Sequence, residues 1–256
     1  MTAESTLPGL LGNHQKCWLW GRNTVRETLA HGRWPILELY LAESLPSEER
    51  HAALHRADAL GIPVFIETKK QLERKCHQPD HQGYLAKMAE FPYADAACLL
   101  SAPSTAPLWS ILDQVHDAFN FGAMIRSAEV FGLDALFIGE ISQVGVTSHV
   151  ARSSSGAVNR IPIARTTSLP TLAKKMKQRG ITLVGASEKA DTPLTGYDFT
   201  RPTAIVLGNE GHGLSPAMHD HCTHLLRIPQ HGHIGSLNAA VAAAIFFYEA
   251  RRQRHN

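Results

Sequence analysis

The chain has 256 residues, of which 44% are apolar and 19% charged, and its formal net charge is +2 at pH 7. This length allows one large domain or two modest ones, and the composition is that of an ordinary globular protein. So small a net charge excludes a uniformly basic chain. A surface that binds nucleic acid would therefore have to be a local patch of basic residues. No apolar run approaches the roughly 20 residues of a membrane helix, which argues against a membrane partner.

The N-terminus lacks the charged start and apolar core of a secretory signal, and we interpret residues 1–16 as a flexible tail. The cysteines, scattered and without a C-x-x-C pair, predict free thiols in a reducing cytoplasm. They are Cys17, Cys76, Cys98 and Cys222.

Residues 17–91 alternate between helical and strand patterns. "GRNTVRETLAHG" (21–32) has apolar residues four apart and a closing glycine, and an amphipathic pattern runs over 47–61. Period-two alternation or short apolar runs predict strands within 36–43, 62–67 and 83–90. We therefore expect a small α/β domain here, followed by a linker over 92–107, which is rich in proline, alanine and serine.

A second α/β pattern fills residues 108–256. Predicted helices within 121–132, 169–180 and 237–253 lie between apolar runs that predict strands. Such alternation predicts a largely parallel sheet covered by helices on both faces. The predicted strands lie within 109–115, 135–140, 159–165, 181–187, 203–208 and 224–229.

The glycine-rich turn "IVLGNEGHGLS" (205–215) fits none of the common glycine motifs. The dinucleotide pattern G-x-G-x-x-G and the phosphate-loop pair Gly-Lys are both absent, as are G-x-S-x-G and H-E-x-x-H. "HDHCTH" (219–224), with His212, His231 and His233 near it, has no standard zinc spacing. We expect a histidine-rich helix end there and no metal.

Three polar segments follow predicted strands, so the carboxyl edge of one sheet should bring them together. The first contains Asn120, placed to cap a helix, and Arg126 two turns further on. The second is the glycine turn, with Glu210. In the third, Ser236 is placed to cap an alanine-rich helix that includes Asn238. Taken singly, these residues also fit plain capping, surface or packing roles.

In this order, "NFGAMIR", "GNEGHGLS" and "IPQHGHIGSLNAAVAAAI" resemble the three motifs of the SpoU (TrmH-like) family of RNA ribose 2'-O-methyltransferases, within the SPOUT class. "SSSGAVNRIPI" is similar to a further family segment, and residues 17–91 resemble the family's N-terminal substrate-binding domain, which has the L30e fold. One departure is Ala118 after Asp117, where the family often has proline.

The resemblance implies an α/β fold in which a C-terminal SPOUT domain, with a parallel sheet, helices on both faces and a trefoil knot, joins a smaller L30e-like domain. It also implies S-adenosylmethionine as cofactor, with glycine turns wrapping its neutral adenosine. Arg126 would orient the substrate phosphate, Asn120 would fix the hydroxyl or the arginine, and Glu210 would hold Arg126 or a loop. The implied catalytic residues are Asn120, Arg126, Glu210, Ser236 and Asn238; the implied cofactor-binding residues are Leu207, Gly208, Asn209, Gly211, Ile228, Pro229, Ser236 and Leu237.

The expected partners are RNA and a second copy of the chain, bound through the C-terminal domain. The L30e-like unit favours ribosomal RNA, with transfer RNA as the alternative. A catalytically silent RNA-binding or assembly factor is the competing class. The absence of the dinucleotide pattern G-x-G-x-x-G disfavours a nucleotide-dependent oxidoreductase. Besides the first unit, the expected RNA contacts are Arg152, Arg160, Lys174, Lys175 and Arg179.

Overall fold

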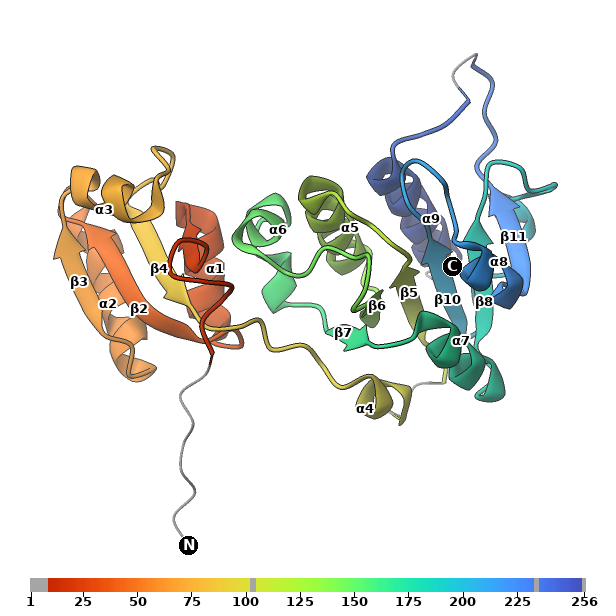
Figure 1. Ribbon diagram of the computed structural model, residues 1–256, viewed down its shortest axis with the longest axis horizontal. Coiled ribbons are helices and arrows are strands. Elements are labelled where there is room, and N and C mark those ends of the chain that lie inside the picture. The colour runs from red at the N-terminus through yellow and green to blue at the C-terminus, as the bar shows by residue number, and fades with distance from the viewer. Residues whose placement is uncertain (1–8, 102–104, 233–234, 255–256) are drawn as a thin grey trace, which may run out of the picture. The chain divides into compact units, whose positions relative to one another are not determined.

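The computed structural model describes residues 9–101, 105–232 and 235–254, so parts of the expected tail and linker, and His233, lie outside the described residues. The chain forms two compact units (Figure 1). The N-terminal unit comprises Met1–Pro92 and Val146–Asn159, and the C-terminal unit comprises Tyr93–Gly145 and Arg160–Asn256.

The N-terminal unit contains a four-stranded sheet with strand order β1-β4-β2-β3. Its predicted helices and strands all form. Gly32 ends α1 in the left-handed region (φ 64°), which glycine adopts without a Cβ penalty. The elements are β1 (Trp18–Trp20), α1 (Arg22–His31), β2 (Ile36–Ala42), α2 (Ser47–Ala59), β3 (Val64–Glu67), α3 (Lys69–Cys76) and β4 (Tyr84–Met88).

Within residues 17–91, two elements were not predicted. Strand β1 has only three residues, too few to show a period. Helix α3 buries only Leu72 and Cys76, so its apolar signal is weak. A capping box starts α3 instead: the Thr68 hydroxyl accepts from the Gln71 amide, and the Gln71 side chain accepts from the Thr68 amide.

Residues 146–159 belong to the N-terminal unit although the sequence pattern placed them in the second half. They contain α6 (Ser148–Ser153) and a 3-10 turn (Ala157–Asn159). The Ser148 hydroxyl donates to the Trp18 carbonyl (2.6 Å), and the buried Asn159 amide donates to the Thr28 hydroxyl (3.0 Å). These long-range bonds leave no signal in the local sequence pattern.

Arg152 in the same segment is paired with Asp80, and its guanidinium lies 4.7 Å from the centre of the Trp20 ring. Partial burial acts to raise the pKa of Asp80, but the hydrogen bonds and charge of Arg152 prevail, so the Asp80 pKa is lowered. The pair therefore stabilises the fold above the ordinary Asp pKa and is lost on strong acidification. Arg152 thus has a structural partner, and its contact with RNA stays a prediction.

The C-terminal unit contains a seven-stranded sheet, ordered β7-β6-β5-β10-β8-β11-β9, in which every pairing is parallel. All six predicted strands form, and a two-residue edge strand, β9, is added. The strands are β5 (Leu108–Leu112), β6 (Ala135–Gly139), β7 (Ile163–Thr166), β8 (Thr182–Ala186), β9 (Thr192–Pro193), β10 (Thr203–Leu207) and β11 (His224–Arg227).

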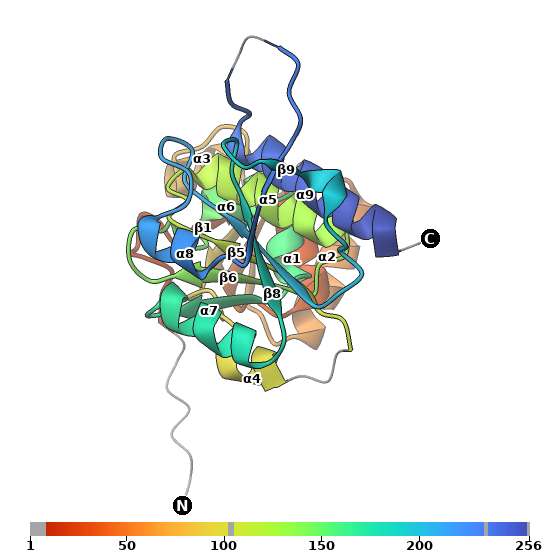
Figure 2. The same cartoon turned by 90° about the vertical axis from the view of Figure 1, so that its right-hand side faces the viewer.

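Helices cover both faces of this sheet, as Figure 2 shows. Helix α5 packs beside α9 on one face. On the other face, side chains of α4, α7 and α8 join the core formed with the strands. These helices are α4 (Ala96–Ser101), α5 (Ala118–Val130), α7 (Leu169–Gln178), α8 (Pro216–His221) and α9 (Ala239–Arg254), and a 3-10 turn covers Leu194–Gly196.

Part of the expected linker is therefore structured, because α4 lies within it and Leu100 is buried in the core. Within the ranges that the structure describes, no helix combines the length and the hydropathy needed to cross a membrane. The trefoil knot stays a prediction.

We predict that Arg152→Ala loosens the segment 146–159 without unfolding the chain, since an exposed ion pair contributes at most about 1 kcal/mol. Hydrogen exchange measured by mass spectrometry should show faster exchange in α6, while amides of α7 in the C-terminal unit keep their rates. Arg179→Ala, which removes an exposed arginine elsewhere, is the matched control. Unchanged exchange in α6 would contradict the anchoring role.

Candidate functional site

The loop that follows β10 closes on itself. The backbone groups of Asn209 and Gly213 exchange two hydrogen bonds of 2.9 Å. The Asn209 side chain donates to the Gln114 carbonyl (2.9 Å) and accepts from the Gly211 amide (2.7 Å). At the far end, the Ser215 amide donates to the buried Asp113 carboxylate (2.7 Å). The side chain of Asn209 therefore builds the loop rather than reaching for a ligand.

Glycine is required in this loop because the chain folds against itself. A Cβ on Gly208 would lie 2.2 Å from the carbonyl carbon and oxygen of Gly213, and Gly213 itself has a φ of 69°. The sequence argument expected these glycines to make room for adenosine. At Gly208 the space is instead occupied by the returning backbone, which fixes the loop next to the pocket described below.

Asn120 connects the three polar segments. Its side-chain amide donates to the Glu210 carboxylate (2.9 Å), and its carbonyl oxygen accepts from the Asn238 amide (3.0 Å). These three residues are far apart in sequence, and the carboxyl edge of the sheet brings them together as expected. Glu210 thus holds Asn120, whereas the expectation was that it holds Arg126 or a loop.

Two helix caps differ from those expected. Asp117, not Asn120, caps α5, and its carboxylate accepts from the Asn120 backbone amide (2.7 Å). Asn238, not Ser236, caps α9, since its side-chain oxygen accepts from the amides of Ala240 (2.9 Å) and Val241 (3.2 Å). Each observed cap lies within a turn of the residue expected to cap the helix. Because Asp117 caps α5, the Asn120 side chain is available for the network.

Arg126 lies on α5 with an exposed side chain, and among the described residues it has no hydrogen-bond or ion-pair partner. Six residues along a helix correspond to about 9 Å of rise and about 120° of net rotation from Asn120. The side chains of Asn120 and Arg126 therefore leave α5 at different heights and in different directions. Arg126 is therefore an exposed cation of α5 and not a member of the network.

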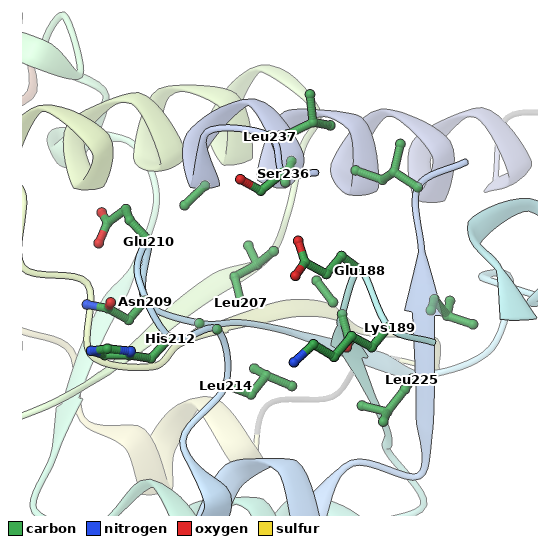
Figure 3. Close-up of a pocket in the computed structure, with 18 of the residues that line it drawn as sticks. Glu188, Lys189, Leu207, Asn209, Glu210, His212, Leu214, Leu225, Ser236 and Leu237 are labelled. Carbon is green, nitrogen blue, oxygen red and sulfur yellow. The ribbon is translucent and has the colours of Figure 1, made fainter. Parts of the chain in front are cut away.

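A pocket of about 760 Å³ opens beside this loop, at the carboxyl ends of β8, β10 and β11 (Figure 3). It takes in nearly all of the residues predicted to bind the cofactor; Pro229 is the exception. Of the predicted catalytic residues, Glu210 and Ser236 line it. The predicted residues among its walls are Leu207, Gly208, Asn209, Glu210, Gly211, Ile228, Ser236 and Leu237.

The sequence analysis missed one wall of the pocket, the stretch from Ala186 to Lys189. It follows β8, which pairs directly with β10. The predicted strand at 181–187 was the one sequence feature that could have indicated this wall, because parallel strands of a sheet end at the same edge. Which strands are neighbours is a property of the sheet order, and the local pattern did not reveal it.

His219 and His221 lie at the end of the short helix α8, as expected, and His224 begins β11. Burial raises the pKa of the Cys222 thiol to about 12, with the charge of Asp113 adding to the effect. A thiol must lose its proton to bind a metal well, so Cys222 is a poor ligand at neutral pH. Within the described part of the chain, no group of histidine, cysteine and carboxylate side chains is arranged to hold a metal ion.

Comparison with known proteins decides the family. Residues 107–248 match the model of the SpoU rRNA Methylase family, and residues 18–94 match that of an RNA 2'-O ribose methyltransferase substrate-binding domain. The chain belongs to the SpoU methylase family. It is 33% identical to the putative TrmH family tRNA/rRNA methyltransferase YacO of Bacillus subtilis, over 95% of this chain and 98% of that one.

Two further relatives are informative. The 23S rRNA (guanosine-2'-O-)-methyltransferase RlmB of Shewanella oneidensis is 31% identical over 93% of this chain and 98% of its own length. The SpoU methyltransferase AviRb of Streptomyces viridochromogenes, solved in complex with AdoMet, superposes with a TM-score of 0.78 at 26% identity, covering 96% of this chain and 95% of that one.

The pocket suits S-adenosylmethionine. Its volume lies in the usual range for small-molecule sites, about 300–1,000 Å³. Leu207, Leu225 and Ile228 supply apolar walls for a neutral nucleoside, and the glycine turn brings backbone groups to the pocket. Lys189 is the only lysine or arginine among the lining residues, so the pocket offers no cationic cluster for a polyphosphate.

We predict that Gly208→Ala weakens binding of S-adenosylmethionine at least tenfold, because the added Cβ forces the 208–213 loop apart. Isothermal titration calorimetry on the folded variant measures this, and a lowered Tm should accompany it. Gly196→Ala is the control, since its Cβ would meet only ordinary contacts at 3.4 Å or more. Equal affinities for Gly208→Ala and the native chain would show that the loop closure does not shape the pocket.

Proposed function

We propose that the protein transfers a methyl group from S-adenosylmethionine to the 2'-hydroxyl of a ribose in RNA, with ribosomal RNA as the favoured target. The observation that carries the proposal is the bond network from Glu210 through Asn120 to Asn238, which joins the three motif segments beside the pocket. The 23S rRNA methyltransferase activity in the name of RlmB and the match to a substrate-binding domain support the RNA target. Such a reaction belongs to the cytoplasm, where these RNAs are made and used.

Asn120 is the residue best placed to position the hydroxyl. After its bonds to Glu210 and Asn238, its amide group retains one N–H and one oxygen lone pair. Because both partners fix its orientation, little reorganisation is needed when a hydroxyl binds. When bound, the cofactor supplies the electrophilic methyl group, and in-line placement of the attacking oxygen lowers the barrier. Ser236, on the pocket wall, adds a hydroxyl near the same region.

Arg126 is proposed to bind a phosphate of the RNA and to stabilise the charge that develops on the ribose oxygen. Its guanidinium is always protonated, so it is a poor proton acceptor. The proton of the hydroxyl is therefore assigned to a phosphate oxygen or water. An exposed arginine without a protein partner is free for this contact.

The N-terminal unit is proposed to select the RNA, with added phosphate contacts from α7. Helix α7 buries Leu172, Ala173 and Met176 and leaves its cations in solvent. Lys174, Lys175 and Arg179 are the exposed cations proposed to contact phosphates, while the exposed Lys177 donates to the His221 carbonyl (3.2 Å). Transfer RNA remains the alternative target, and a silent assembly factor would keep the fold without needing to bind the cofactor.

A second copy of the chain is proposed to cover the exposed sides of α5 and α9. Val241 (48% exposed) and Tyr248 (54%) lie seven residues apart on α9, which places them on one face. Phe119 (66%) and Val130 (65%) are exposed on α5, which packs beside α9. An apolar stripe spanning two helices of one unit is typical of a homodimer interface.

We predict that Arg126→Ala lowers methyl transfer more than tenfold while the Kd for S-adenosylmethionine changes less than twofold. The assay incubates the protein with radiolabelled cofactor and separated ribosomal and transfer RNA pools, then maps ribose positions that resist alkaline hydrolysis. Arg126→Lys keeps the positive charge but loses the planar set of guanidinium donors, so its rate of methyl transfer should lie between those of the native chain and Arg126→Ala. Equal losses of binding and transfer would assign Arg126 to the cofactor instead. Labelling of neither pool by the native chain, despite cofactor binding, would contradict the activity.

We predict that Val241→Glu converts a dimer into a monomer, because a carboxylate would be buried in the apolar interface. Sedimentation velocity at several protein concentrations measures the association state. Ile141→Glu is the control, since Ile141 is 79% exposed but lies outside the stripe. A native chain that sediments as a monomer, or a Val241→Glu dimer, would contradict the interface.

A further inference from the structure

Glu188 occupies a defined place relative to the glycine turn. Strand β8 ends at Ala186 and pairs in parallel with β10, with Val206 opposite Gly185. Continuing this register past the strand ends places Glu188 level with Asn209, at the start of the glycine turn. The two segments form facing walls of the same pocket.

The carboxylate of Glu188 points into the pocket, toward Leu207 (Figure 3). Its side chain has no hydrogen-bond or ion-pair partner among the residues that the structure places. Glu210, the other carboxylate of the pocket, is held by Asn120. The pocket therefore contains one carboxylate committed to the protein and one available to a ligand.

The position of Glu188 indicates which part of the ligand it meets. Glu210 and the Asn120 network mark the end where the methyl acceptor binds, and Figure 3 shows Leu207 between the two carboxylates. In one class of parallel sheet, the dinucleotide-binding fold, an acidic side chain that follows the glycine turn binds a ribose hydroxyl, and a carboxylate in this pocket can do the same chemistry. The physical reason is that a carboxylate only accepts hydrogen bonds and its two oxygens match two neighbouring hydroxyl donors.

Other side chains near this point are less suited to that role. The Asn209 amide is used by Gln114 and Gly211. Lys189 is a donor, and Figure 3 shows its amine directed toward Leu214, away from the Glu188 carboxylate. We propose that Glu188 is a specificity-determining residue that accepts hydrogen bonds from the 2'- and 3'-hydroxyls of the cofactor ribose. This inference rests on the proposed use of S-adenosylmethionine.

The test compares three ligands that share the ribose but differ in charge. They are S-adenosylmethionine, S-adenosylhomocysteine, which lacks the sulfonium charge, and 5'-methylthioadenosine, which lacks the amino-acid group. We expect Glu188→Gln to raise the Kd of all three by about the same factor, near tenfold, in calorimetric titrations of the folded chain. For the native chain, removing the 2'-hydroxyl from methylthioadenosine should weaken binding similarly, and that loss should shrink in Glu188→Ala.

Glu140→Gln is the matched control. Glu140 is also an exposed glutamate just past a parallel strand of this sheet, β6, but it does not line the pocket. Its substitution should leave all three Kd values within twofold. Circular dichroism and the Tm confirm that each variant is folded.

Each other outcome overturns the assignment. Weakening confined to the two ligands with an amino-acid group would place the methionine ammonium at Glu188. Weakening confined to S-adenosylmethionine would mean that the carboxylate senses only the sulfonium charge. If the native chain binds the ligands and Glu188→Gln leaves their Kd values unchanged, Glu188 does not contact them. If the native chain binds none of the ligands, the proposed use of the cofactor is contradicted instead.

Discussion

The arrangement of the site depends on the side chain of one asparagine. Asn120 receives one bond from Asn238 and gives one to Glu210, so three segments from distant parts of the chain share a single fixed group. Removing Glu210 would leave an N–H of the Asn120 side chain without its bond, and removing Asn238 would leave the Asn120 carbonyl oxygen without one; either loss would free Asn120 to rotate. Because Asn238 also caps α9, the same network sets where that helix begins.

The glycines of the turn beside this network are required by the packing of the loop against itself, independently of any ligand. The backbone at Gly208 approaches Gly213 so closely that no side chain fits, and Asn209 and Asp113 satisfy polar groups at the two ends of the loop. A loop tied at both ends can present Glu210 and its main chain at fixed positions. Leu207, Leu225 and Ile228 give the pocket apolar walls that suit a neutral nucleoside, and Glu188 and Ser236 add polar groups to its lining.

The division of the chain into units has a functional consequence. The segment 146–159 lies between two strands of the methyltransferase sheet in sequence, yet it folds on the N-terminal unit through Ser148, Arg152 and Asn159. The proposed RNA-selecting unit is thus built from two separate stretches of the chain. Its connection to the C-terminal unit runs through the peptide chain at three points, after residues 92, 145 and 159.

The sequence by itself determined the local elements and the chemistry of the motifs. Strong apolar periods at 21–32 and 169–180 and the apolar runs of the central strands predicted helices and strands that the structure contains, because those signals depend on neighbours in the chain. The motif letters identified the family and the residues that meet at the sheet edge. Only the tertiary structure decided the strand order, and with it the wall at Glu188, the true caps Asp117 and Asn238, and the placement of 146–159. These features depend on contacts between residues tens of positions apart, where local pattern carries no information about which partner is chosen.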